Sequence, residues 1–164
     1  MLAKASQEKL WGILRILMGW IFLWPFLDKL YGLGFTTSSD QAWLKGISPT
    51  TGFLNFATQG PFSDLFKSLA GNSFVDWLFM IGLLLIGLSL ILGIGIRIAT
   101  YSGSLLLFLM YLAVLPPEHN PVIDEHIIYA VLLFTLNRVD AGRYMGFGNT
   151  WQQLPIVKKF PCLR

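Results

Sequence analysis

Three adjacent ionisable residues, Asp124, Glu125 and His126, open an apolar segment, and Asp28 lies in another apolar segment near the N-terminus. Carboxylates and imidazoles can exchange protons with a bound substrate. If Arg138 marks the inner boundary of a membrane, Asp124 lies roughly 21 Å from it along a helix, inside a hydrocarbon core about 30 Å thick. Ionisable groups at such depth are functional candidates when they face other helices or a wet cavity.

The same stretch also has a structural explanation. Asn120 is a plausible helix N-cap, Pro121 suits the first helical position, and acidic residues after them favour the helix dipole. Adjacent helical residues diverge by about 100°, so the three ionisable side chains cannot all enter one pocket. His119 could join them as a metal ligand, but the divergence and the lack of a second histidine or cysteine cluster argue against a tightly bound metal.

Aromatic residues accompany Asp28. Trp20, Trp24 and Asp28 fall within one stripe of a helix, and the two tryptophans are either part of an interfacial aromatic belt or the apolar wall of a site. We expect a polar recess on the outer side, walled by these tryptophans, with Asp124 or Glu125 as the inward acid. Its expected border consists of Asp28, Lys29, Glu125 and His126.

The elements that must position these residues are membrane helices. The 164-residue chain is 54% hydrophobic and only 13% charged, unlike a soluble domain. A membrane helix needs about 20 largely apolar residues. We therefore predict an all-α, integral membrane four-helix bundle forming a single domain, 1–164. Its expected helices cover 10–33, 75–94, 98–115 and 122–137, with an outer loop at 35–72 containing short interfacial helices and a tail at 139–164.

The basic residues predict the orientation. Lys29, Lys45 and Lys67 fall on one side of the expected helices, and the other nine fall on the opposite side, which predicts that both termini are cytoplasmic in the plasma membrane. The net charge of +3 then reflects topology and not nucleic-acid binding. The nine are Lys4, Lys9, Arg15, Arg97, Arg138, Arg143, Lys158, Lys159 and Arg164.

The chain contains one cysteine, Cys162. A single thiol excludes an internal disulfide relay, a thiolate-bound iron–sulfur cluster and a CxxCH haem attachment within this chain. Any redox chemistry therefore requires a cofactor or a partner from outside.

Four segments, "GWIFLWPFLDKLYGLGF", "AWLKGISPTTGFL", "DWLFMIGLLLIGLSLILGIGIRIA" and "LPPEHNPVIDEHIIYA", resemble the DoxX/DoxD family across about residues 15–151. That family includes the small membrane subunit of an archaeal thiosulfate:quinone oxidoreductase. The resemblance implies a four-helix membrane protein that delivers electrons from sulfur compounds to quinone beside a second subunit. Only the "FLDK" and "NPVIDEH" positions are carried over.

These observations lead to two main hypotheses. In the first, a quinone packs on the tryptophans, His126 donates a hydrogen bond to a quinone carbonyl, and Asp124 or Glu125 passes protons outward. In the second, the chain is a non-enzymatic membrane scaffold or assembly protein for a partner complex. Passage of a proton or small solute is a third possibility. Membrane lipid is an expected partner, and small-residue helix faces also permit a homo-oligomer.

Overall fold

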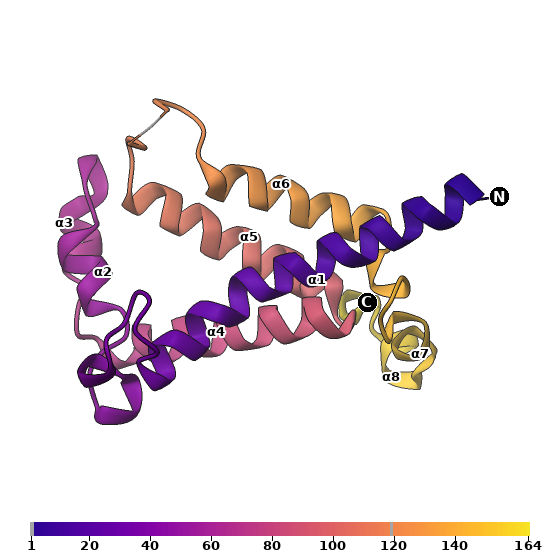
Figure 1. Cartoon of the computed structure of the whole chain (residues 1–164), viewed down its shortest axis with the longest axis horizontal. Helices are drawn as coiled ribbons and strands as arrows, with labels where there is room; N and C mark the ends of the chain where they lie inside the picture. Colours follow the sequence, from indigo (N-terminus) through magenta and orange to yellow (C-terminus); the bar gives the residue numbers. More distant parts are fainter. Residues whose placement is uncertain (1, 119) are drawn as a thin grey trace.

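The computed structural model describes residues 2–118 and 120–164, and its described part consists of helices and turns without strands. The four longest helices are α1 (Leu2–Tyr31), α4 (Ser73–Leu92), α5 (Ile96–Ala113) and α6 (Glu125–Arg138). Helix α1 packs on α4, α4 on α5, and α5 on α6 (Figure 1). The predicted all-α fold class is confirmed.

Three of these helices are long and apolar enough to cross a membrane: Ala5–Tyr31 of α1, α4 and α5. Their outward faces are apolar, and Leu78, Leu85 and Leu105 are each more than half exposed. A soluble monomer rarely exposes apolar surface of this extent, whereas lipid tails cover it without cost. The described helices therefore indicate a membrane protein.

Helix α6 begins later than predicted. The Asn120 side-chain oxygen accepts hydrogen bonds from the backbone N–H groups of Val122 and Ile123, both at 2.9 Å, which holds this stretch in a turn. Asp124 is extended (φ −127°, ψ −174°) and is the N-cap of α6. The predicted Asn120 cap and Pro121 start are thus wrong. The 14 residues of α6 rise only about 21 Å, which is short for a complete membrane crossing.

The sequence "SFVD" predicts a capping box at the start of α4, formed by Ser73 and Asp76. Asn72 caps the helix instead, with its side-chain oxygen 2.9 Å from the backbone nitrogen of Phe74. Asp76 does not return a bond to the helix start, because its carboxylate accepts hydroxyl groups of the outer loop. At the other end, Gly93 (φ +75°) terminates α4 in the left-handed conformation that glycine adopts most readily.

Close helix packing depends on two glycines that face each other. A Cβ placed on Gly87 of α4 would lie 2.9 Å from the backbone nitrogen of Leu23 in α1, and one on Gly19 would lie 2.9 Å from the Gly87 carbonyl oxygen. Gly82 has open space around it. Gly87 therefore lets α1 and α4 approach closely, whereas Gly82 takes no part in this contact. Helix α1 continues without a break through Pro25.

The core lies where all four long helices meet. Gly103 of α5 faces Phe22 of α1, Ile86 of α4 and Leu133 of α6, and Phe22, Ile86 and Leu133 are almost fully buried. The Thr100 hydroxyl donates to the carbonyl oxygen of Leu133 at 3.2 Å, which satisfies a buried polar group.

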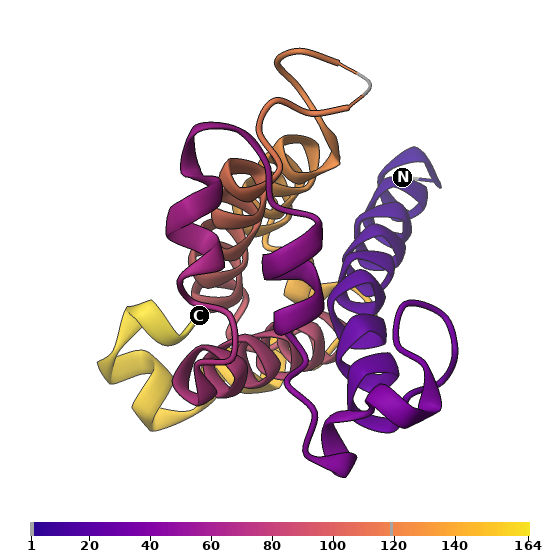
Figure 2. The ribbon, with the colours of Figure 1, turned by 90° about the vertical axis from the view of Figure 1, so that its left-hand side faces the viewer.

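The outer loop folds over one end of the long helices. It contains α2 (Thr51–Phe56), α3 (Ser63–Lys67) and the short 3-10 helices η1 (Ser39–Gln41), η2 (Trp43–Lys45) and η3 (Gly60–Phe62). Figure 2 shows this segment crossing in front of the long helices. Short helices were predicted here, and the structure contains them.

The C-terminal segment lies at the opposite end, and it is folded. It contains η4 (Ala141–Arg143), α7 (Gly148–Gln153), α8 (Pro155–Lys159) and η5 (Pro161–Leu163). Ala141 and Val157 are fully buried. Figure 1 places this segment at the same end of the molecule as the start of α1.

Candidate functional site

The N-terminus of α6 carries a carboxylate–histidine pair. The Asp124 Oδ1 accepts the backbone N–H groups of His126 (3.0 Å) and Ile127 (3.3 Å). The Asp124 Oδ2 lies 2.7 Å from His126 Nδ1, and the two side chains are only 9% and 13% exposed. One carboxylate therefore caps the helix with one oxygen and holds the imidazole with the other.

This geometry suits proton exchange. A carboxylate at Nδ1 fixes the ring orientation and favours the tautomer with a proton on that nitrogen. Within the described part of the chain, no hydrogen bond occupies His126 Nε2. His126 Nε2 is thus the ring atom that can exchange a hydrogen bond or a proton with a bound molecule.

Glu125 lies apart from this pair. It is the first residue of α6, and its side chain is exposed, whereas the Asp124 side chain is nearly buried. The sequence left open whether Asp124 or Glu125 faces inward. In the structure it is Asp124, because its carboxylate accepts hydrogen bonds from the free backbone N–H groups at the start of α6.

Asp28 has a different set of partners. It is 1% exposed, and its Oδ2 accepts the backbone N–H (2.9 Å) and hydroxyl (2.7 Å) of Thr36. Its Oδ1 lies 3.3 Å from the backbone nitrogen of Phe35. Asp28 therefore fastens the start of the outer loop to the end of α1. Lys29 beside it is half-buried.

The tryptophans accompany Asp28. The rings of Trp20 and Trp24 lie 5.6 Å apart, and Trp24 meets Phe35 edge-on at 4.9 Å. Trp20 is 47% exposed, so it faces the surroundings more than a closed site. These rings form an aromatic cluster on α1 and the outer loop.

The predicted recess is not assembled from these parts. Helices α1 and α6 diverge toward the end that carries the outer loop (Figure 1), so the end of α1 and the start of α6 lie well apart. The Asp28 carboxylate is hydrogen-bonded to Thr36, and His126 is hydrogen-bonded to Asp124. Trp20, Trp24 and Asp28 therefore lie in one part of the structure, and His126 lies in another.

A second buried carboxylate fastens the loop to α4. The Asp76 Oδ1 accepts the hydroxyl groups of Ser48 (2.8 Å) and Thr50 (2.5 Å). Trp43 of η2 packs edge-on against Trp77 of α4, with centroids 4.6 Å apart. Sequence reasoning missed this contact; the hydroxyl-rich "SPTT" run was its only signal.

Sequence reasoning also misjudged Arg15, which it treated as a boundary charge. The side chain is fully buried. Its guanidinium donates to Ala141 O (3.1 Å), Ile91 O (2.9 Å), Tyr144 O and Met145 O (both 3.0 Å), and also to Leu90 O. The signal was present, because an arginine inside an apolar run must find polar partners.

Two hollows lie at the end opposite the Asp124–His126 pair. One of about 400 Å³ is bordered by arginines of α5, α6 and the C-terminal segment, and a neighbouring open groove lies along α5. In the described residues, no three histidine, cysteine or acidic side chains are grouped to hold a metal. His119, one of the ligands considered, lies outside the described residues.

No protein-family model, curated protein or solved structure matches the chain. Its function therefore has to be inferred from the chemistry of these side chains.

Proposed function

We propose that the chain is a DoxX-type membrane subunit that interacts with quinone in an oxidoreductase linked to the oxidation of sulfur compounds such as thiosulfate. The observation that carries this proposal is the nearly buried Asp124–His126 pair at 2.7 Å. The resemblance of four sequence segments to that family supports the choice of quinone.

Quinone reduction takes up two electrons and two protons, and this chain would handle the protons. His126 donates one proton from Nε2 to a quinone carbonyl oxygen, while the Asp124 carboxylate orients the ring. Water at the exposed start of α6 returns this proton to the ring and supplies the second proton to the other quinone carbonyl oxygen. The electrons come from a partner subunit, because the chain offers a single exposed cysteine.

The proposed setting is a four-helix bundle in the plasma membrane with both termini cytoplasmic. Helix α6 completes the bundle, and its short length is accommodated by local thinning of the bilayer and by Arg138 extending toward the headgroups. The start of α1 and the C-terminal segment lie at the same end of the molecule, which supports this arrangement (Figure 1).

The test compares Asp124→Asn and His126→Gln with wild type in native-lipid discs. Asparagine keeps the helix cap but removes the charge. We expect both variants to lose bound quinone and to lower thiosulfate-dependent quinone reduction, measured with the partner, by at least about tenfold, since positioned acids contribute about 10²–10⁴-fold. Glu118→Gln, an exposed acid outside the pair, is the control. Unchanged quinone content and rate in both variants would refute the proposal.

The scaffold function remains the second candidate, and the tightly fastened outer loop favours it. Two buried carboxylates hold this loop, which nevertheless exposes Phe56 (88%), Leu44 (67%) and Leu65 (61%). A rigid segment with exposed apolar side chains can bind a partner or lipid. A stoichiometric partner that co-purifies without quinone, and whose activity survives both pair variants, would support the scaffold.

A further inference from the structure

A basic cavity lies where α5 begins and α6 ends. Its volume is about 400 Å³, and its walls come from α5, α6, α7 and the turns around them. A cavity of this size accommodates a small ligand. The charged side chains that line it are Arg97, Arg138, Asp140, Arg143 and Arg164.

The charges in this cavity are unbalanced. Asp140 is the one acidic side chain in its lining, and it is already engaged by Arg143 (2.5 Å) and by the side-chain amide of Gln152 (2.9 Å). Gln152 also accepts from Arg143 at 2.7 Å. Across residues 2–118 and 120–164, no ion pair with a side-chain carboxylate involves Arg97, Arg138 or Arg164. The guanidinium groups of Arg97, Arg138 and Arg164 thus border one cavity without an ion pair to an acidic side chain of the described residues.

The backbone holds the cavity wall in place. The backbone N–H of Arg97 donates to the Arg164 carbonyl oxygen at 2.6 Å, and the Trp151 indole N–H donates to the Leu163 carbonyl oxygen at 2.6 Å. The first bond fastens the C-terminal segment to the start of α5, and the second holds α7 to η5 within that segment. The arginines of the C-terminal segment therefore extend from backbone that is held by hydrogen bonds.

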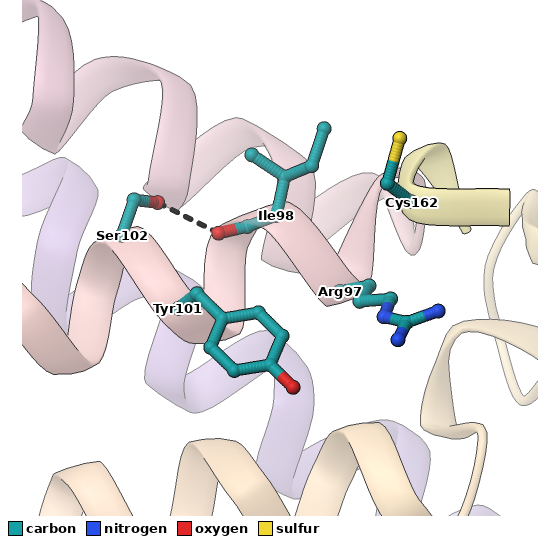
Figure 3. Close-up of a pocket in the computed structure, with 5 residues that line it drawn as sticks. All are labelled: Arg97, Ile98, Tyr101, Ser102 and Cys162. Carbon is teal, nitrogen blue, oxygen red and sulfur yellow. Dashed lines mark hydrogen bonds between the residues drawn. The ribbon is translucent and has the colours of Figure 1, made fainter. Parts of the chain in front are cut away.

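An apolar groove adjoins the basic cavity. Arg97 and Tyr101 line both hollows, and Ile98 and Cys162 also line the groove (Figure 3). The Ser102 hydroxyl in the groove donates to the Ile98 carbonyl oxygen at 2.8 Å, so its polarity is already satisfied (Figure 3). The groove runs along α5, one of the helices able to cross a membrane.

We propose that the cavity binds a phosphate-bearing anion, and that this anion is the headgroup of an anionic membrane phospholipid. Guanidinium groups match the geometry of phosphate oxygens, and basic pockets between membrane helices suit such headgroups. Free phosphate compounds share this chemistry, but they lack an acyl chain that could bind in the apolar groove. The phosphate occupies the space between Arg97 and Arg138, and an acyl chain lies over Ile98 and Tyr101. This binding does not depend on the quinone reaction.

The experiment measures lipid binding to the full purified chain by native mass spectrometry and by thermal stabilisation. Its probes are phosphatidylglycerol, phosphatidylcholine and soluble glycerol 3-phosphate. We expect wild type to prefer phosphatidylglycerol over phosphatidylcholine by at least tenfold, and to bind glycerol 3-phosphate at least tenfold more weakly. The double variant Arg97→Gln/Arg138→Gln should lose at least tenfold in phosphatidylglycerol affinity. Lys158→Gln, an exposed basic residue outside the cavity lining, should change it less than twofold.

A groove variant distinguishes the source of the phosphate. Ile98→Ser should weaken phosphatidylglycerol binding several-fold and leave glycerol 3-phosphate binding unchanged. Equal binding of the anionic and zwitterionic lipids by wild type, or equal loss in Lys158→Gln and the double variant, would overturn the proposed site. Glycerol 3-phosphate binding as tightly as the lipid would overturn the lipid source. Each of these readouts is independent of quinone content and turnover.

Discussion

Arg15 shows how a single residue joins segments far apart in the chain. Its guanidinium donates to backbone carbonyl oxygens at the end of α4 and in the turn after α6. Glycines make room for it, because a Cβ on Gly146 would lie 2.8 Å from an Arg15 nitrogen. The fixed fork of guanidinium donors suits several separated acceptors, whereas an ammonium group is a single point.

We expect Arg15→Met to lower the unfolding free energy by about 2–4 kcal/mol, since it leaves buried carbonyl groups without their donor. Arg15→Lys should recover only part of this loss, because its ammonium cannot reach both segments. Thermal unfolding in detergent, combined with limited proteolysis of residues 139–164, measures the effect. Lys9→Met, at an exposed position on the same helix, is the control. A melting temperature for Arg15→Met equal to that of the control would show that these hydrogen bonds contribute little.

At the scale of elements, the approach of α1 to α4 depends on glycine and not on apolar size. Lipid offers no hydrophobic penalty for separating helices, so close backbone contact and dispersion have to hold them together. Gly87 contacts the backbone of α1, whereas Gly82 on the same helix has open space. Gly87 and Gly82 therefore allow one substitution at a close contact to be compared with the same substitution in open space.

We predict that Gly87→Ala lowers the unfolding free energy by roughly 1–3 kcal/mol, because the added methyl group would overlap backbone that cannot move independently. Gly82→Ala should leave it unchanged or raise it slightly, because alanine favours the helix by up to about 1 kcal/mol. Thermal melts of the two variants in the same lipid discs provide the comparison. Equal melting temperatures would contradict the proposed close contact.

At the scale of the whole molecule, three contacts fix the outer loop across the helix ends. Asp28 holds it to α1, Asp76 holds it to α4, and the side-chain amide of Gln59 donates to the carbonyl oxygens of Val114 (3.1 Å) and Pro116 (3.0 Å) after α5. The C-terminal segment closes the other end through Arg15. The two ends of the molecule are thus built differently, one around carboxylates and the other around arginines.

This difference predicts the orientation in the membrane. Cys162 is exposed at the arginine-rich end, and Gln41 is exposed in the outer loop. A membrane-impermeant maleimide should label Gln41→Cys, in a Cys162→Ser background, in intact cells. Native Cys162 should react only after permeabilisation, since basic segments remain cytoplasmic. The reverse labelling pattern would invert the proposed topology.

The sequence by itself determined the protein class and the approximate positions of α1, α4 and α5. Apolar content and segment length are local properties, and they are sufficient to predict helices that suit a membrane. The expected 75–94 and 98–115 helices accordingly lie close to the observed Ser73–Leu92 and Ile96–Ala113. The ionisable stretch from Asp124 to His126 was also visible in the sequence, and two of its members form the observed pair.

Only the tertiary structure decided which side chains meet. Asp28 and His126 share no site because α1 and α6 diverge toward the outer loop (Figure 1), and spacing along the chain does not specify the angle between two helices. Arg15 was mistaken for a boundary charge because its acceptors lie as far as 130 residues away in sequence. The start of α6 depended on a local competition, in which the Asn120 side chain stabilised a turn and Asp124 became the cap.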